Sequence, residues 1–226
     1  MRPLVIIPAR GGSKRLPGKN IMQLNGKPLI HFTIEAAKEV FGISQICIST
    51  DDRTIKEIAE KTGVNIPFLR PEHLATDTAD TREVLVHAHQ FYRDELNYDA
   101  DVIVLLQPTS PFRTEKHISE ALQLFDYAVD QVISVKETDV NPYFLHFEED
   151  ENGFLKKVLN KSYTRKQDCP TVYEINGAIY IINTVSLYKR DTLIFDKTRK
   201  YVMDKRSSID IDDLLDFKFA EFILDN

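Results

Sequence analysis

The chain is poor in cysteine, lacks tryptophan and contains no long hydrophobic run. With only Cys47 and Cys169, a disulfide framework and a thiolate metal cluster are both excluded. No apolar stretch is longer than about six residues, whereas a membrane-spanning helix needs roughly 20. The first residues also lack the apolar core and cleavage site of a signal peptide. We therefore expect a soluble, cytoplasmic protein with no membrane partner.

Acidic side chains outnumber basic ones, and the two kinds are unevenly distributed. The chain carries 29 basic and 35 acidic residues, and this net charge of -6 argues against general binding to nucleic acid. Residues 1–30 contain six basic side chains and no acidic one, so the other 196 residues have a net charge of -12. A positive segment on an acidic body suits a local anion site. A solvated basic surface is the alternative.

Short apolar runs rich in β-branched residues alternate with helical patterns along the first part of the chain. The runs at 4–7, 46–50, 102–106 and 132–135 predict strands that are covered on both faces. Apolar residues at helical spacing lie between them. This alternation predicts an α/β fold, a mostly parallel sheet flanked by helices.

The pattern changes after about residue 138. Three more runs resemble strands but have no helix between them, which predicts a small antiparallel lobe at about 138–185. These runs lie at 143–147, 154–158 and 178–182, and a turn at 150–153 and the polar stretch 160–170 connect them. A helix is expected at 214–224. We expect one domain that spans 1–226 and carries this lobe.

The sharpest local signal is the segment 8–20, PARGGSKRLPGKN, directly after the first predicted strand. Ligands bind at the carboxyl ends of strands in such sheets. Two adjacent glycines, beginning with Gly11, let backbone N–H groups approach an anion, and four cations between Arg10 and Lys19 can neutralise a polyphosphate. Neither a dinucleotide fingerprint nor a Walker A loop is present, which argues against an oxidoreductase. An exposed basic hairpin is the alternative.

A second signal is the acidic sequence SIDIDD at 208–213. In an extended segment residues two apart face the same side, so Asp210 and Asp212 can hold one hard cation such as Mg²⁺. The alternative is that Asp212 or Asp213 is the N-cap of the following helix. A polyphosphate loop elsewhere favours the metal, because Mg²⁺ usually binds through one or two carboxylates plus substrate phosphates.

The third signal, QPTSPFR at 107–113, follows the predicted strand 102–106. Polar groups at this position face a ligand in many α/β sheets. Thr109 and Pro111 equally suit a simple turn into the next helix. Other chemistries have little support, because the six histidines are scattered and no G-x-S-x-G sequence is present.

Together these segments resemble the acylneuraminate (sialic acid) cytidylyltransferases. The resemblance runs almost end to end, through IIPARGGSKRLPGKN at 6–20, STDD at 49–52, LRPEHLATDTA at 69–79, LLQPTSPFRT at 105–114, NGAIYI at 176–181 and SIDID at 208–212. The glycine-rich loop alone would suit any sugar nucleotidyltransferase. QPTSPFR together with NGAIYI and SIDID is much more specific.

The resemblance implies a Rossmann-like fold and transfer of CMP from CTP to the anomeric hydroxyl of a nine-carbon 2-keto sugar acid. Pyrophosphate is released, Mg²⁺ is required, and family members are usually homodimers whose lobe reaches the partner's active site. Position by position, it assigns the triphosphate to Arg10, Gly11, Lys19 and Asn20, the cytidine to Arg70, Ala79 and Thr81, the sugar acid to Gln107, Arg165 and Tyr180, and the metal to Asp210 and Asp212. Arg10, Lys19 and Asp210 are the implied catalytic residues.

The departures from the family pattern lie on the sugar side. Glu174 stands where relatives of sialate specificity often have arginine, and Phe144 replaces a common lysine. Leu193 and Ile194 replace an aromatic pair, with Phe195 next to them. These changes favour a related nonulosonic acid, such as legionaminic acid, over N-acetylneuraminic acid. The alternatives are CMP transfer to the eight-carbon 3-deoxy-octulosonate and a catalytically silent nucleotide-binding protein.

Overall fold

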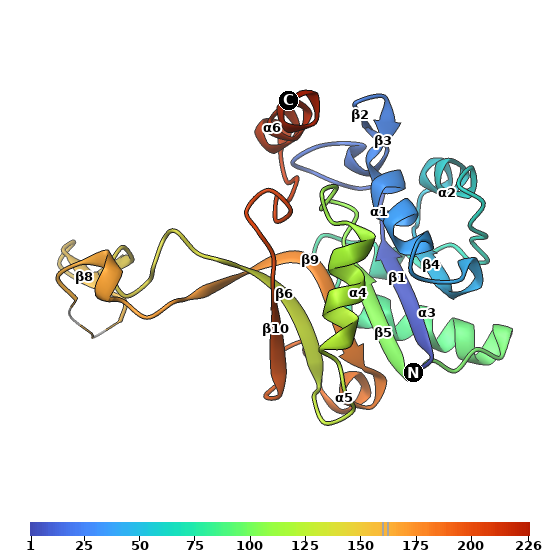
Figure 1. The fold of residues 1–226 in the computed structure, drawn as a ribbon. Coiled ribbons are helices and arrows are strands. Elements are labelled where there is room, and N and C mark those ends of the chain that lie inside the picture. The colour runs from blue at the N-terminus through green and yellow to red at the C-terminus, as the bar shows by residue number, and fades with distance from the viewer. Residues whose placement is uncertain (160, 162) are drawn as a thin grey trace.

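The computed structural model describes residues 1–159, 161 and 163–226, so positions 160 and 162 of the predicted polar stretch lie outside the described residues. A six-stranded sheet of order β10-β6-β9-β5-β1-β4 forms the centre (Figure 1). β9 runs antiparallel to both of its neighbours and the other strands run parallel, which confirms the predicted mostly parallel sheet. The strands are β1 Pro3–Pro8, β4 Ile46–Ser49, β5 Val102–Leu106, β6 Gln131–Glu137, β9 Tyr173–Asn183 and β10 Thr198–Val202.

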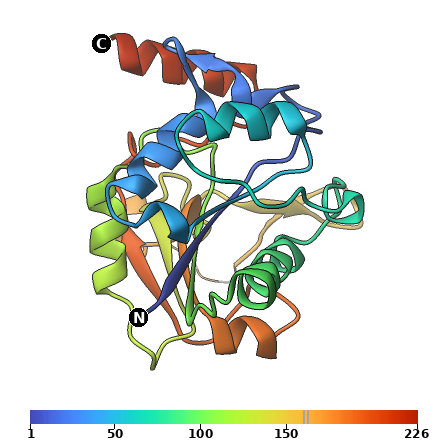
Figure 2. The ribbon, with the colours of Figure 1, turned by 90° about the vertical axis from the view of Figure 1, so that its right-hand side faces the viewer.

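Helices cover both faces of this sheet (Figure 2). Because alternate residues of a strand point to opposite faces, Val5 and Ile7 pack with α1, α2 and α4, whereas Leu4 and Ile6 pack with α3 and α5. The helices are α1 Leu29–Lys38, α2 Arg53–Glu60, α3 Thr81–Leu96, α4 Glu115–Gln123, α5 Thr184–Lys189 and α6 Leu214–Asp225. Burial on both faces explains the continuous apolar runs. Among the described residues, no helix combines the length and apolarity needed to cross a membrane.

The C-terminal helix α6 packs on the loop that follows β1. Its Phe217 and Ala220 form a small core with Leu16 and Leu24, and Ile211 joins the same cluster. This contact places the segment 208–213 beside the glycine-rich loop (Figure 1). Short elements complete the fold: β2 Gln23–Leu24, β3 Lys27–Pro28, and the 3₁₀ turns η1 Lys19–Ile21, η2 Ile43–Gln45, η3 Glu72–Leu74 and η4 Lys166–Asp168.

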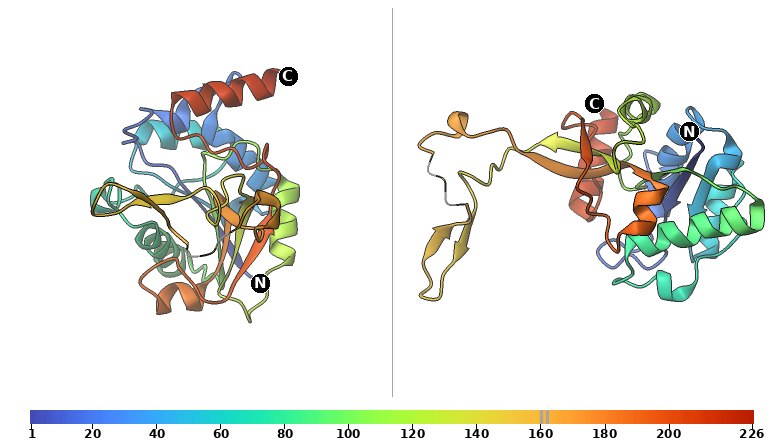
Figure 3. Two further views of the ribbon diagram at one scale, coloured as in Figure 1. Left: turned by 90° about the vertical axis from the view of Figure 1, so that its left-hand side faces the viewer. Right: turned by 90° about the horizontal axis from the view of Figure 1, so that it is seen from below.

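An antiparallel hairpin projects from the sheet as a lobe (Figures 1 and 3). It consists of β7 Phe147–Glu149 and β8 Leu155–Lys157, and β8 lies within the predicted strand 154–158. The strand predicted at 143–147 is wrong except for its last residue. Asn141 caps a turn there, because its side chain accepts from the N–H of Tyr143 and its carbonyl from that of Leu145.

The third run assigned to the lobe lies elsewhere. Residues 178–182 belong to β9, which is inserted between β5 and β6 in the central sheet. The projecting part is therefore narrower than the predicted 138–185. β9 begins at the base of the lobe and ends in the main core, so it connects the two (Figure 3).

Candidate active site

The glycine-rich loop lines a basic pocket of about 410 Å³ at the carboxyl end of β1. Arg10 and Lys14 both pair with Asp77, and the Arg10–Asp77 distance is 2.9 Å. The hydrogen bond from Lys14 lowers the pKa of Asp77. These contacts give the pocket a cluster of cations whose present partners are carboxylates of the same chain.

On the other side of the basic pocket, Asp212 holds two more cations. Arg15 lies 3.0 Å and Lys19 3.2 Å from its carboxylate oxygens. The Lys19 ammonium also donates to the carbonyl of Ile211 at 2.7 Å, and its side chain is only 12% exposed. Lys19 is therefore aimed at the segment 208–213 by two contacts.

The glycine at position 11 is required by the close approach of two segments. A Cβ atom on Gly11 would lie 2.6 Å from Oδ2 of Asp52, the residue that caps α2. The Gly11 N–H donates to Oδ1 of Asp51 at 3.1 Å. Nearby, Asn20 is buried and donates to the carbonyl of Arg10 at 3.0 Å. Asn20 thus stabilises the backbone of the loop at Arg10.

A second pocket, which we call the Arg70 pocket, has a volume of about 260 Å³ and adjoins the basic pocket. It brings together residues far apart in the sequence: Arg10, Arg70, Ala79, Thr81 and Gln107. Arg70 is buried, and its guanidinium donates to Oγ of Ser49 at 3.0 Å and to the carbonyl of Leu74. Burial lowers the pKa of Arg70 to about 10. Its guanidinium forms a fixed, polar wall of the pocket.

A third pocket, the Tyr180 pocket, has a volume of about 410 Å³ and shares Thr81 and Gln107 with the Arg70 pocket. Leu193, Ile194 and Phe195 form one side of it. The predicted pair Gln107 and Tyr180 therefore meets here.

Arg165 does not reach the Tyr180 pocket within this chain. Its guanidinium makes two hydrogen bonds with Asp168 in the lobe, at 2.8 and 2.9 Å, and its side chain is 72% exposed. The lobe projects away from the sheet (Figure 3). The role assigned to Arg165 stays a prediction, because it requires Arg165 to reach the acceptor pocket of a second chain.

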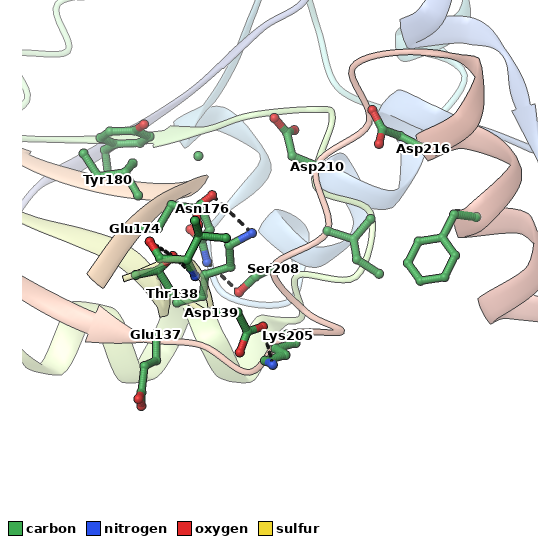
Figure 4. Close-up of a pocket in the computed structure, with 16 residues that line it drawn as sticks. Glu137, Thr138, Asp139, Glu174, Asn176, Tyr180, Lys205, Ser208, Asp210 and Asp216 are labelled. Carbon is green, nitrogen blue, oxygen red and sulfur yellow. Dashed lines mark hydrogen bonds and ion pairs between the residues drawn. The ribbon is translucent and has the colours of Figure 1, made fainter. Parts of the chain in front are cut away.

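A larger cleft of about 600 Å³, the Asp210 cleft, lies between the base of the lobe and α6. Tyr180 from β9 and Asp210 from the segment before α6 both border it (Figure 4). Glu174 also lines the cleft and lies 3.3 Å from Lys136 on the neighbouring strand β6. The negative charge that Glu174 introduces is therefore partly compensated by a cation.

Of the acidic residues at 208–213, Asp213 is the helix cap. Its carboxylate accepts from the N–H of Leu215 at 2.8 Å and of Asp216 at 3.1 Å, so the capping alternative is confirmed for this residue. Asp210 and Asp212 do not cap the helix, and Asp212 is instead paired with Arg15 and Lys19. Desolvation raises the pKa of Asp210, and the Asp212 carboxylate acts in the same direction.

This donor set fits Mg²⁺. Asp210 borders the Asp210 cleft and Asp212 the basic pocket; both supply hard carboxylate oxygens, and a divalent cation between them would relieve their repulsion. Within the described part of the chain, no cluster of three or more His, Cys, Asp or Glu residues is arranged to hold a metal. A metal at Asp210 and Asp212 would complete its coordination with water or with oxygens of a substrate.

The QPTSPFR segment has a mixed role. Gln107 faces the two pockets, whereas Thr109 holds the acidic segment by accepting from the N–H of Ile211 at 2.9 Å. Arg113 is buried and donates to the carbonyls of Gln107 and Ala178. Thr109 and Pro111 do lie in turns, as the turn interpretation expects, while the ligand-facing role of Gln107, which lines two pockets, stays a prediction.

Sequence reasoning missed Asp77 as the partner of Arg10 and Lys14. Asp77 stands in the polar run ATDTAD, just before Asp80, the N-cap of α3. A polar run before a helix usually signals only a cap. The negative charge of Asp77, opposite to that of the basic loop, was the one signal in the sequence. A charge alone does not show which residues lie close together in the fold.

Comparison with known proteins gives a consistent result. The family model of the cytidylyltransferases matches residues 4–222. The chain is 34% identical over 226 residues to CMP-N,N'-diacetyllegionaminic acid synthase of Legionella pneumophila, an alignment that covers 100% of this chain and 97% of the relative. It is 38% identical over 221 residues to N-acylneuraminate cytidylyltransferase of Streptococcus agalactiae, covering 96% of this chain but only 52% of that longer relative.

The fold comparison agrees with the sequence comparison. The solved structure of CMP:2-keto-3-deoxy-manno-octonic acid synthetase complexed with CTP superposes with a TM-score of 0.73 at 18% identity, covering 100% of this chain and 99% of the other. At this identity the likeness concerns the fold. The sequence match over nearly the whole length shows that the chain belongs to the cytidylyltransferase family.

Proposed function

We propose that this chain transfers CMP from CTP to the anomeric hydroxyl of a nonulosonic, sialic-type acid and releases pyrophosphate. One observation carries the proposal: the basic pocket, the Arg70 pocket and the Tyr180 pocket adjoin one another through shared lining residues. Arg10 and Asp77 line the first two, and Thr81 and Gln107 line the last two. Arg10 and Gln107 both line the Arg70 pocket, so a nucleotide bound there can direct its phosphates toward the basic pocket while an acceptor approaches the α-phosphate from the side of Gln107. Relatives named for such reactions support the assignment.

In this proposal the nucleoside occupies the Arg70 pocket, with Ala79 and Thr81 against it. The triphosphate lies in the basic pocket, where Arg10 and Lys19 donate to its oxygens and Gly11 allows the backbone to approach. Charge develops on these oxygens as the phosphorus–oxygen bond to the leaving pyrophosphate breaks. Preorganised donors of this kind are each worth roughly 3–4 kcal/mol of transition-state stabilisation.

Asp210 and Asp212 would hold Mg²⁺ beside Lys19. The bound metal supplies Lewis-acid activation of the α-phosphate and can lower the pKa of the attacking hydroxyl. With Asp212 engaged in this way, Arg15 and Lys19 would be free to donate to phosphate oxygens instead. The site must also align the acceptor hydroxyl for in-line attack. In this proposal Gln107 and Tyr180 bind the acceptor and hold it in position.

The acceptor is proposed to be a relative of N-acetylneuraminic acid, such as legionaminic acid. The Glu174–Lys136 pair at the Asp210 cleft and the aliphatic residues Leu193 and Ile194 support a pocket with altered charge and polarity. The similarity to the Legionella synthase agrees with this choice. The eight-carbon 3-deoxy-octulosonate is the second candidate acceptor, favoured by the fold likeness alone.

A homodimer would complete the site. The lobe exposes apolar side chains on both strands of its hairpin, Phe147 and Leu155, together with Phe154 in the turn. Exposed apolar groups on a projecting hairpin favour contact with a second copy. In such a pair Arg165 approaches the partner's acceptor site. The working unit is then one nucleotidyltransferase domain per chain, with its lobe extended across the dimer.

The test is pyrophosphate release from CTP and Mg²⁺ with N-acetylneuraminate, N,N'-diacetyllegionaminate and 3-deoxy-octulosonate in parallel. Release with a nonulosonic acid that stops on chelation of the metal is the expected result. CTP binding in calorimetry without release would indicate a silent binder instead.

Two variants test the assigned roles in the same assay. Lys19→Ala and Asp210→Ala are each expected to lower turnover by roughly 100-fold or more, since each removes a group that stabilises the transition state. Lys38→Ala on α1 and Asp94→Ala on α3, both at exposed positions outside the pockets, are the matched controls. Near-normal turnover in Lys19→Ala or Asp210→Ala would contradict the role of that residue.

A further inference from the structure

One carboxylate holds two cations of the glycine-rich loop. Oδ1 of Asp77 lies 2.9 Å from Nη1 of Arg10, and Oδ2 of Asp77 pairs with the ammonium of Lys14. Asp77 lines both the basic pocket and the Arg70 pocket. Both of its oxygens therefore engage cations at the place where, in the proposed function, the phosphates of a bound nucleotide enter the basic pocket.

The segment that carries Asp77 is anchored at its two ends. Before it lies the buried side chain of Arg70, and after it Asp80 caps α3. Among the described residues, hydrogen bonds and ion pairs join the segment 76–79 to the rest of the chain only through Asp77. The carboxylate can therefore leave the two cations without breaking the contacts of either anchor.

Phosphate oxygens would compete with Asp77 for the same donors. The hydrogen bond from Lys14 lowers the pKa of Asp77, so the carboxylate is charged at neutral pH and repels a phosphate placed beside it. The side chain of Arg10 is 33% exposed, that of Lys14 80% and that of Asp77 35%, and ion pairs with such exposure are individually weak. Asp77 can thus give way to a polyphosphate and return when the polyphosphate leaves.

This competition bears on the release of pyrophosphate. Cations that stabilise charge on a leaving group also retain it after the bond has broken, and product release limits turnover in many enzymes. A carboxylate that occupies the same cations part of the time lowers their apparent affinity for an anion in proportion. We propose that Asp77 replaces the departing pyrophosphate on Arg10 and Lys14 and thereby favours its release. This role rests on the proposed function.

A purely structural role for Asp77 predicts a change of the opposite sign. If its ion pairs only held Arg10 and Lys14 in a geometry that binds phosphate, loss of the carboxylate would leave both cations less ordered and weaken anion binding. Competition predicts that loss of the carboxylate makes anion binding tighter. The direction of the change in affinity therefore separates the two roles.

The test is calorimetric binding of inorganic pyrophosphate, without divalent metal, to the unmodified protein and to Asp77→Asn. Without metal, Asp212 keeps its ion pairs with Arg15 and Lys19, so the change reports on the other two cations. We expect the dissociation constant of pyrophosphate to fall by about fivefold, the upper range for an exposed ion pair. In the turnover assay, pyrophosphate should inhibit Asp77→Asn at a correspondingly lower concentration.

Glu72→Gln is the matched control, because Glu72 is an exposed acid of the preceding turn η3 and lines neither pocket. It removes the same charge, and its dissociation constant should stay within about twofold of the unmodified protein. Lys14→Ala provides a second comparison, since it removes one of the two contested donors. In that background Asp77→Asn should tighten binding by only about twofold.

The outcomes separate this inference from the proposed function. An unchanged or increased dissociation constant in Asp77→Asn would overturn the inference. So would an equal gain in Glu72→Gln, or the same factor with and without Lys14, because either would show a general effect of charge. Should Asp77→Asn fail to fold, Asp77→Ser carries the same prediction. Tighter binding in Asp77→Asn, together with no pyrophosphate release from CTP by the unmodified protein, would refute the proposed function and the role in product release with it.

Discussion

Arg113 offers a demanding test of how the site is held together. It is 2% exposed and ends the QPTSPFR segment. Its guanidinium donates to the carbonyls of Gln107 at 3.0 Å and Ala178 at 2.9 Å, and to Oγ1 of Thr33 at 2.5 Å. Burial lowers the pKa of Arg113 to about 9, and the described residues place no carboxylate against it. Arg113 is thus a buried cation that neutral acceptors hold in place.

The expected cost of Arg113→Met follows from the groups it leaves behind. Loss of a hydrogen-bond donor to a buried carbonyl costs about 1–3 kcal/mol, and two carbonyls depend on Arg113. The hydroxyl of Thr33 can still donate to the carbonyl of Gln107, which limits the loss there. Removing the charge also removes its desolvation cost, which offsets part of the penalty. We expect a net loss of roughly 2–4 kcal/mol in the free energy of unfolding.

Urea unfolding followed by far-UV circular dichroism measures this change. Arg113→Lys provides a second comparison, since one ammonium group cannot reproduce the three bonds of a planar guanidinium. It should also be less stable than the unmodified protein. Arg93→Met, which removes an exposed arginine on α3, should stay within about 0.5 kcal/mol. The reasoning fails if Arg113→Met is as stable as the unmodified protein, because the burial cost then equals or exceeds the contribution of the three bonds.

Two further predictions concern titratable groups in the core. His89 donates from Nε2 to the carbonyl of Ala100 and accepts at Nδ1 from Tyr188, and burial lowers its pKa. Below a pH of about 6.5 the unfolded state therefore binds the proton in preference to the folded state. The free energy of unfolding should decrease as the pH is lowered, and it should decrease less in His89→Gln. Urea unfolding at pH 8 and pH 5.5 measures this difference. An equal loss of unfolding free energy between the two pH values in the unmodified protein and in His89→Gln would contradict the assignment. Burial raises the pKa of Cys47 to about 12, so a thiol reagent at pH 8 should modify it only after unfolding; rapid labelling in the native protein, measured in a Cys169→Ser variant, would show that the strand opens.

The strands of the sheet were predictable because burial on both faces leaves a strong signal. Runs such as Val102–Leu106 are apolar without interruption, and their bounds agree with the structure. Local hydrogen bonding limits the same reasoning. The run at 143–147 is rich in aromatic residues, yet the side chain of Asn141 holds it in a turn. Strand order is a long-range property, so the position of β9 between β5 and β6 has no local signal.

The candidate site was predicted less evenly than the fold. The matched motifs correctly grouped Arg70, Ala79 and Thr81, and the structure places them in one pocket. The sequence left open whether Asp212 or Asp213 caps α6, because the choice depends on where the helix begins to within one residue. The structure shows that Asp213 is the cap.

The antiparallel strand β9 explains why these features depend on one another. Its inner half carries Tyr180 between β5 and β6, and its outer half carries Glu174 at the base of the lobe. Between them Gly177 adopts φ of +76°, and the β6–β9 register shifts at this level. A side chain there would be strained, and its Cβ would also meet Asp210 at 3.9 Å. β9 is therefore one continuous strand from the base of the lobe to the proposed acceptor pocket, and it passes beside the proposed metal ligand Asp210, so we expect a displaced lobe to disturb both.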